Sequence, residues 1–349
     1  MNRPLQLGVL DQSPVSEGSD GAIALRRSVD LAVLTEQLGY GRYWVAEHHG
    51  HAMIAGASPE VLIAAIAAHT SSIRVGSGGV MLPHYSPLKV AETFAALCGL
   101  YPGRIDLGIG RAPGSDPHTM LALQRDRRQL APDDFPEQLA ELLAYLEDDF
   151  PPGHPLARLA ALPGGPERPE VWLLGSSPQS GEWAAQLGLP YAFADFFSSS
   201  AGAAITQRYR ERFEPSRRRV QPHVAIAVAA ICAQSDAEAQ RLASSLRMSA
   251  VLRERGRITP LAPVEDALAF LERHGGSLPS GSARRAIVGS PETVRAGLET
   301  VADEYGADEV LVVTMTHDHG ARRHSYELIA AAFALRGEEA AAPDTLLAS

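Results

Sequence analysis

Short apolar runs alternate along the chain with longer segments in which apolar residues recur at helical spacing. The apolar runs have the length of strands and predict strands at residues 5–10, 43–46, 73–78, 105–110, 171–174, 191–194, 223–232 and 309–314. The longer segments predict helices at residues 24–38, 58–69, 87–101, 135–146, 179–187, 201–213, 236–253, 264–274, 290–305 and 322–336. Because a helical segment follows each strand, the pattern predicts an all-parallel sheet.

Polar or glycine-rich clusters follow four of these apolar runs. The clusters are Glu47-His48-His49, Ser77-Gly78-Gly79, Gly110-Arg111 and Gly175-Ser176-Ser177. An open doubly wound sheet would concentrate such residues at one switch point. A (β/α)8 barrel instead builds one site from the carboxyl ends of several strands. The spread of the clusters along the chain therefore favours a closed (β/α)8 TIM barrel with one polar mouth.

Two stretches interrupt the regular alternation. Residues 112–170 carry many prolines and one predicted helix, and residues 254–283 are largely irregular. Long excursions at the carboxyl ends of strands often cover active sites. We expect one barrel domain over residues 1–336, with an insertion after the fourth strand and an irregular segment before the eighth. The tail, residues 337–349, should be frayed.

Composition narrows the class of protein. The 349 residues are 45% hydrophobic and 21% charged, which is enough to build a large core, and the formal net charge is −10. This acidic balance argues against nucleic acid or an anionic membrane as a partner. Cys98 and Cys232 lie in apolar stretches and are expected to be buried free thiols rather than a disulfide. Residues 1–20 lack a signal-peptide core, so we expect a cytoplasmic protein.

The stretch Gly175-Ser176-Ser177-Pro178-Gln179-Ser180-Gly181 follows a strand and opens a helix. Small residues at such a place expose backbone N–H groups, and the helix dipole favours an anion. The hydroxyl groups of Ser176, Ser177 and Ser180 add donors, so a phosphate group is the natural ligand. Serines also occur at helix starts simply as caps, and the stretch alone leaves both interpretations open.

The histidine and arginine clusters are less specific. His48 at a strand end could act as a general base near neutral pH, or it could be a structural histidine. The neighbouring histidines lack a clear set of carboxylate partners, so no metal site is expected. Arg111 could neutralise an anion or contact a ring carbonyl, and it could equally be a surface arginine. Ser77-Gly78-Gly79 would let a flat ligand approach the main chain, or would form a tight strand end.

Two longer strings carry a family resemblance. Residues 75–87 read Val-Gly-Ser-Gly-Gly-Val-Met-Leu-Pro-His-Tyr-Ser-Pro, and residues 102–114 read Pro-Gly-Arg-Ile-Asp-Leu-Gly-Ile-Gly-Arg-Ala-Pro-Gly. With these strings the chain resembles the bacterial luciferase-like flavin monooxygenase family over residues 5–111, 171–195 and 286–335. It looks most like a branch that includes polyketide-tailoring enzymes. The resemblance implies a (β/α)8 barrel, usually dimeric, that uses reduced FMN and O2.

The resemblance also implies positions for the flavin. Ser77–Gly78 looks like the family's non-prolyl cis peptide beneath the flavin ring. The cradle that the family uses for the FMN phosphate corresponds here to Gly175, Ser176, Ser177 and Ser180.

Further contacts are implied in the same way. Arg111, and with it Arg125, matches the family's phosphate or ring contacts. Glu47 and His48 match the Glu-His pair beside the flavin, with His48 as the catalytic candidate. Gly110 stands where luciferase has a cysteine near the flavin, so light emission is not expected.

The resulting hypothesis is a two-component monooxygenase. A separate reductase would deliver FMNH2, because no nicotinamide motif is visible, and the reaction would run through a flavin C4a-peroxide to oxygenate an organic substrate. His48 would act as base or proton donor. The alternatives are an F420-dependent hydride-transfer enzyme, a non-catalytic flavin-binding subunit, and, more distantly, a barrel enzyme acting on sugars or phosphorylated metabolites.

Overall fold

The computed structural model describes residues 5–111, 116–124, 134–159, 162–197, 201–274 and 286–337. Its strands are β1 Gln6–Asp11, β2 Arg42–Val45, β3 Arg74–Met81, β4 Ile105–Gly110, β5 Glu170–Gly175, β6 Tyr191–Ala194, β7 Val224–Cys232, β8 Ala286–Gly289 and β9 Glu309–Val313. Its α-helices are α1 Gly21–Leu38, α2 Pro59–His69, α3 Pro87–Leu100, α4 Pro117–Leu123, α5 Phe135–Glu147, α6 Pro178–Gln186, α7 Gly202–Glu211, α8 Asp236–Leu242, α9 Ser244–Glu254, α10 Val264–Arg273, α11 Pro291–Tyr305 and α12 His319–Ala332.

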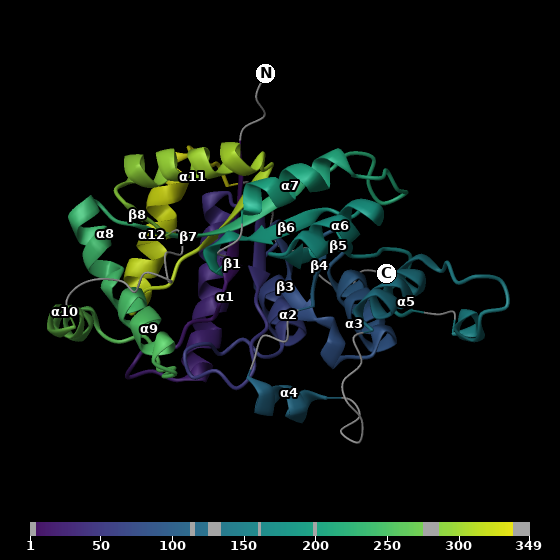
Figure 1. The fold of residues 1–349 in the computed structure, drawn as a ribbon, viewed down its shortest axis with the longest axis horizontal. Helices are drawn as coiled ribbons and strands as arrows, with labels where there is room; N and C mark the ends of the chain where they lie inside the picture. The colour runs from purple at the N-terminus through teal and green to yellow at the C-terminus, as the bar shows by residue number, and fades with distance from the viewer. Residues whose placement is uncertain are drawn as a thin grey trace.

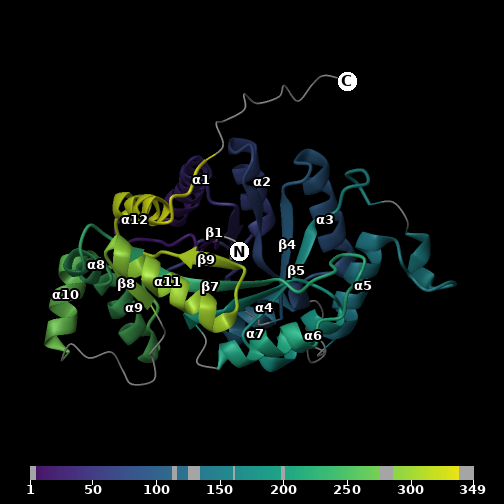
Figure 2. The ribbon, with the colours of Figure 1, turned by 90° about the horizontal axis from the view of Figure 1, so that it is seen from above.

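The strands close into a barrel. Strands β1 to β7 and β9 pair in a ring, since β1 pairs with β9, β9 with β7, and β7 with β6, and every pairing is parallel. Helices surround the strands on the outside (Figures 1 and 2). The predicted (β/α)8 TIM barrel is therefore confirmed, and the eight predicted strands correspond to the eight strands of the ring.

The ninth strand was not predicted. The strand β8 pairs only with the last residues of β7, from Ala229 to Cys232, beyond the point where β7 leaves the barrel ring. Helices α8, α9 and α10 gather beside it at one side of the barrel (Figures 1 and 2). Between the last two ring strands, the described residues thus hold one strand that the sequence did not predict.

The structure also confirms the predicted insertion between the fourth and fifth strands of the ring. It holds α4, which was not predicted, and α5, which was. The predicted single helix over residues 236–253 is wrong in one respect, because it is broken at Ala243 into α8 and α9. Residues 338–349 of the predicted tail lie outside the described residues.

The barrel interior is filled in two ways. Near the carboxyl ends it is apolar, with side chains that include Leu10, Trp44, Trp172, Leu311 and Val313. The rings of Trp44 and Trp172 meet edge to face with centroids 5.2 Å apart. This is the side-chain filling expected of a small barrel, and it closes the channel below the mouth.

At the amino-terminal ends the interior is ionic. Arg42 donates to Glu309 at 2.9 Å and forms an ion pair with Asp106, while the indole of Trp44 donates to Asp106 at 2.9 Å. The Arg42 guanidinium also lies 4.6 Å from the centre of the Trp172 ring. Because each of these buried charges has a partner, the cluster can sit inside the barrel.

The prediction for the two cysteines is also confirmed. Cys98 and Cys232 are both buried and free, as predicted. Burial raises the pKa of each thiol to about 12, so both are protonated at neutral pH. In the described part of the chain, no helix combines the length and apolar character needed to cross a bilayer.

Candidate functional site

Most of the residues singled out from the sequence lie at one end of the barrel. Because all ring strands are parallel, their carboxyl ends share one face. Glu47 and His48 follow β2, Gly78 and Gly79 lie within β3, and Arg111 follows β4. The serine-rich stretch begins at the end of β5. The structure therefore brings these segments to a common mouth, whereas Arg125 lies outside the described residues.

Glu47 is held by contacts within the protein. Its carboxylate is fully buried and accepts hydrogen bonds from the Tyr85 hydroxyl at 2.8 Å and from the Met81 amide at 2.9 Å. It also contacts the His49 ring at 2.7 Å. Burial, together with the neighbouring Glu47 carboxylate, raises the pKa of Tyr85 far above its usual range, so Tyr85 stays a donor. Glu47 thus ties the end of β2 to the end of β3.

His48 has an unmet hydrogen-bonding atom. Its main-chain N–H donates to the carbonyl of Gly56 at 2.7 Å, which fixes the backbone. The ring atom Nδ1 is buried and has no hydrogen-bond partner among the described residues. Burial, with smaller effects of His51 and His49, lowers the pKa of His48 to about 4. At neutral pH the imidazole is therefore neutral and can accept a proton.

The non-prolyl cis peptide lies one residue later than predicted. It joins Gly78 to Gly79, not Ser77 to Gly78. Ser77 belongs to the regular part of the sheet, because its hydroxyl is within 2.9 Å of the Gly108 carbonyl and 3.1 Å of the Gly108 amide. The pairing of β3 with β4 shifts register only after Ser77, and the cis bond falls inside this shift.

The glycines of β3 are also required by packing. A Cβ on Gly79 would lie 2.7 Å from the main-chain oxygen of Gly108, and a Cβ on Gly78 would lie 2.5 Å from the side chain of Leu10. Both distances are too short for real contacts. At Gly79 the contact is with the main chain, so a larger residue would require movement of the strands, whereas at Gly78 the Leu10 side chain would have to shift. The tight strand end considered from the sequence is thus present.

The serine-rich stretch divides into buried and accessible parts. Ser177 is the exposed N-cap of α6, and its hydroxyl accepts from the Ser180 amide at 3.3 Å. Ser180 is buried, with its hydroxyl 2.8 Å from the Ser177 carbonyl and 3.0 Å from the Tyr191 hydroxyl. Ser176 is half-buried, and Gly175 leaves the space that the Ser180 side chain fills. The capping role is therefore real, and Ser177 remains at an accessible helix N-terminus.

Arg111 lies next to this helix. Its side chain is exposed and its guanidinium carbon lies 5.7 Å from the centre of the Trp183 ring on α6. Arg111, at the end of β4, is thus close to the helix that Ser177 caps, although Arg111 and Ser177 lie far apart in the sequence. The dipole of α6 and the charge of Arg111 both favour an anion at this edge of the mouth.

Three further polar residues were missed from the sequence. Gln12 and Ser245 are buried, and Gln12 Nε2 and Ser245 Oγ lack hydrogen-bond partners among the described residues. Tyr85 was missed as the donor to Glu47. Only Gln12 carried a signal, because it lies two residues after the predicted strand at residues 5–10. Unsatisfied buried polar atoms of this kind often mark a place where a ligand or water completes the bonding.

Comparison with known proteins shows the family of the chain. The profile described as luciferase-like monooxygenase matches residues 5–309. The chain is 44% identical over 334 residues to the uncharacterised protein YwcH of Bacillus subtilis, and the alignment covers 95% of this chain and 99% of YwcH. It is 41% identical to a luciferase-like monooxygenase of Escherichia coli, covering 94% and 96% of the two chains. It is 36% identical to the N-acetyl-S-alkylcysteine monooxygenase of Bacillus subtilis, covering 93% and 97%.

Solved structures give the same result. The crystal structure of apo-MsnO8 superposes with a TM-score of 0.88 at 43% identity, covering 95% of this chain and 98% of that one. The oxygenating constituent of 3,6-diketocamphane monooxygenase from Pseudomonas putida, in complex with FMN, shares the fold with a TM-score of 0.69 at 20% identity over 94% and 97% of the chains. An F420-dependent secondary alcohol dehydrogenase also shares it, with a TM-score of 0.65 at 16% identity over 95% and 99%.

Proposed function

Because the chain belongs to the luciferase-like monooxygenase family, we propose that it is the oxygenase component of a two-component flavin system. In the proposed reaction, reduced FMN and O2 convert an organic substrate into its oxygenated product, leaving oxidised FMN and water. A separate reductase would supply the reduced flavin. The FMN complex of a protein with the same fold supports the choice of cofactor, and the monooxygenase relatives support the reaction class.

The residues at the mouth fit a flavin mononucleotide. The N-terminus of α6, with the Ser177 hydroxyl and Arg111, would hold the phosphate. The single observation that carries the proposal is the buried His48 Nδ1 without a partner. An unsatisfied buried polar atom costs about 1–3 kcal/mol, and a ligand at the mouth would remove that cost.

Reduced FMN, when bound, supplies the electrons that activate O2. The imidazole of His48 is neutral at pH 7 because its pKa is lowered. It would therefore accept a proton or a hydrogen bond at Nδ1, and its role in the reaction would be that of a base and not of an acid. Glu47 would be a positioning residue, since its carboxylate is already occupied by Tyr85, Met81 and His49. The apolar interior below the mouth would keep water away from the reaction.

The test compares turnover and flavin binding in two histidine variants. With a flavin reductase present, oxygenation of an N-acetyl-S-alkylcysteine is the first activity to measure, because a relative is named for that substrate. His48→Ala should lower oxygenation by about 10²–10⁴-fold and leave FMN binding in place. His69→Ala, on the exposed end of α2, is the matched control and should behave as wild type. Unchanged turnover in His48→Ala would remove His48 from the mechanism.

The choice of cofactor needs its own measurement. A deazaflavin carries a phosphate too, so the N-terminus of α6 does not discriminate between F420 and FMN. Difference spectroscopy with each cofactor separates them, and saturable binding of F420 without binding of FMN would replace the proposal with hydride transfer. We also propose a homodimer, which light scattering of the full chain would test.

A further inference from the structure

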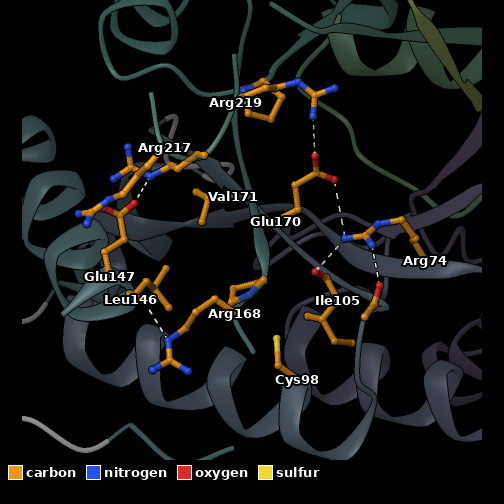
Figure 3. Close-up of a pocket in the computed structure, with 14 residues that line it drawn as sticks. Arg74, Cys98, Ile105, Leu146, Glu147, Arg168, Glu170, Val171, Arg217 and Arg219 are labelled. Atoms are coloured by element: carbon orange, nitrogen blue, oxygen red, sulfur yellow. Dashed lines mark hydrogen bonds and ion pairs between the residues drawn. The ribbon is translucent and has the colours of Figure 1, made fainter. Parts of the chain in front are cut away.

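A cavity lies at the end of the barrel opposite to the mouth. It has a volume of about 640 Å³, and its walls come from the starts of β3, β4 and β5, the end of α5 and the loop before β7 (Figure 3). Five arginines line it: Arg74, Arg168, Arg217, Arg218 and Arg219. Of the described lining residues only Glu147 and Glu170 are acidic. The lining therefore carries an excess of positive charge in a chain whose formal net charge is −10.

The two glutamates each pair with more than one arginine. Glu170 lies between Arg219, at 2.9 Å, and Arg74, at 3.7 Å (Figure 3), and it also lies 3.6 Å from Arg42 of the barrel interior. Glu147 forms ion pairs with Arg217 and Arg218. Each glutamate carries one charge against at least two guanidinium groups, so the lining carboxylates leave part of the positive charge unbalanced.

Two carboxylates outside the lining take up some of the remaining positive charge. Asp106, which is fully buried, pairs with Arg74, and the exposed Asp149 pairs with Arg217 at 2.6 Å. Neither aspartate lines the cavity. Asp106 therefore holds Arg74 from the barrel interior, whereas Asp149 meets Arg217 at the protein surface.

Arg168 is the lining arginine that has no carboxylate partner among the described residues. Its guanidinium donates to three main-chain oxygens, those of Leu146 at 2.9 Å, Gly165 at 2.6 Å and Glu167 at 2.9 Å, and forms no ion pair with the described residues. In Arg219 the Nε atom is buried without a partner in the described part of the chain. The cavity is therefore lined by more positive charge than its carboxylates neutralise, and by an N–H donor that has no acceptor among the described residues.

We propose that this cavity binds a small phosphorylated molecule through Arg168, Arg217 and Arg219. Arginine forks match the geometry of phosphate oxygens and bind them with charge-assisted hydrogen bonds. The volume of about 640 Å³ lies within the range of small-molecule sites. Glu147 and Glu170 act as internal counterions until the ligand takes over their arginines. No residue here belongs to the barrel mouth, so the inference stands apart from the proposed function.

The test is a calorimetric titration of the full chain with inorganic pyrophosphate at constant ionic strength. Arg217→Gln, whose side chain is 54% exposed and thus tolerant of change, should weaken binding about ten-fold. Glu147→Gln should tighten it by about the same factor, because it removes a competing charge and releases two arginines. Arg295→Ala, an exposed arginine paired with Glu299 on α11, is the matched control and should bind like wild type.

The Glu147→Gln variant separates a ligand site from a purely structural ion cluster. A structural cluster predicts lower thermal stability in Glu147→Gln and no gain in pyrophosphate affinity, and that result would overturn the proposal. Absence of saturable binding would overturn it as well. If Ser177→Ala abolishes the binding heat while Arg217→Gln leaves it unchanged, pyrophosphate binds at α6 and the inference is wrong.

Discussion

Protonation of His48 should cost the protein stability as the pH falls below neutrality. Burial, with smaller effects of His51 and His49, lowers the pKa of His48 from 6.5 to about 4 in the folded protein. In the unfolded chain the same group titrates near its ordinary value. Between these two pKa values the unfolded state binds more protons, so the free energy of unfolding rises with pH over this window.

The magnitude follows from the two pKa values. Between pH 8 and pH 5 the unfolding free energy should fall by about 2 kcal/mol through His48 alone, and by about 3 kcal/mol once the group is fully protonated. The loss begins near the unfolded pKa and ends near the folded one. Above the unfolded pKa the group is neutral in both states and contributes no pH dependence.

Urea unfolding at a series of pH values measures this effect. His48→Gln removes the titrating group and keeps a polar side chain. Between pH 8 and pH 5 the unfolding free energy of this variant should therefore fall by about 2 kcal/mol less than that of the wild type. Carboxylates that titrate in both proteins cancel in the comparison. Equal pH dependence in the two proteins, or an NMR titration of His48 with a midpoint near 6.5, would refute the reasoning.

Three other predictions concern single positions. Ser177→Ala and Ser290→Ala each remove an N-cap hydroxyl and should each cost about 1 kcal/mol in urea unfolding, but only Ser177→Ala should weaken FMN binding in fluorescence titrations. Arg42→Ala removes an ion-pair partner from the buried carboxylates of Asp106 and Glu309, of which Asp106 keeps Arg74, and should cost about 3 kcal/mol by the same unfolding assay. Gly79→Ala places a methyl group 2.7 Å from a main-chain oxygen of β4 and should reduce FMN affinity, whereas Gly41→Ala, whose nearest contact would be 3.9 Å, should not.

The barrel and its mouth could be predicted from the sequence because both depend on local patterns. Apolar runs mark the strands, and in a parallel barrel the residue after each run lies at the same end. Glu47 and His48 were found in this way. The partners of Glu47 were not, because Met81 and Tyr85 lie 34 and 38 residues further along the chain and meet it only in the fold.

The errors have physical reasons of the same kind. Ala243, where the predicted helix breaks, is a good helix former, and no residue type there indicates the break. The strand β8 is short and only partly buried, and it exists because β7 extends beyond the barrel to pair with it. The position of the cis peptide depends on the register of β3 against β4, which is a property of two strands and not of one segment.

The arginine cavity could not be predicted for a related reason. Its lining comes from separated parts of the chain, which include the starts of β3, β4 and β5, the end of α5 and the loop before β7. In the sequence, Arg217, Arg218 and Arg219 stand out only as three adjacent cations. The cavity becomes visible when the amino-terminal ends of the strands are assembled beside them (Figure 3).

The central claim is that this protein binds reduced FMN and couples its oxidation by O2 to oxygenation of a substrate. The most direct measurement mixes the protein, loaded anaerobically with reduced FMN, with oxygenated buffer and follows the return of the oxidised flavin spectrum. The proposed function predicts a return slower than that of free FMN. Return at the rate of free FMN, or failure to bind reduced FMN at all, would contradict it.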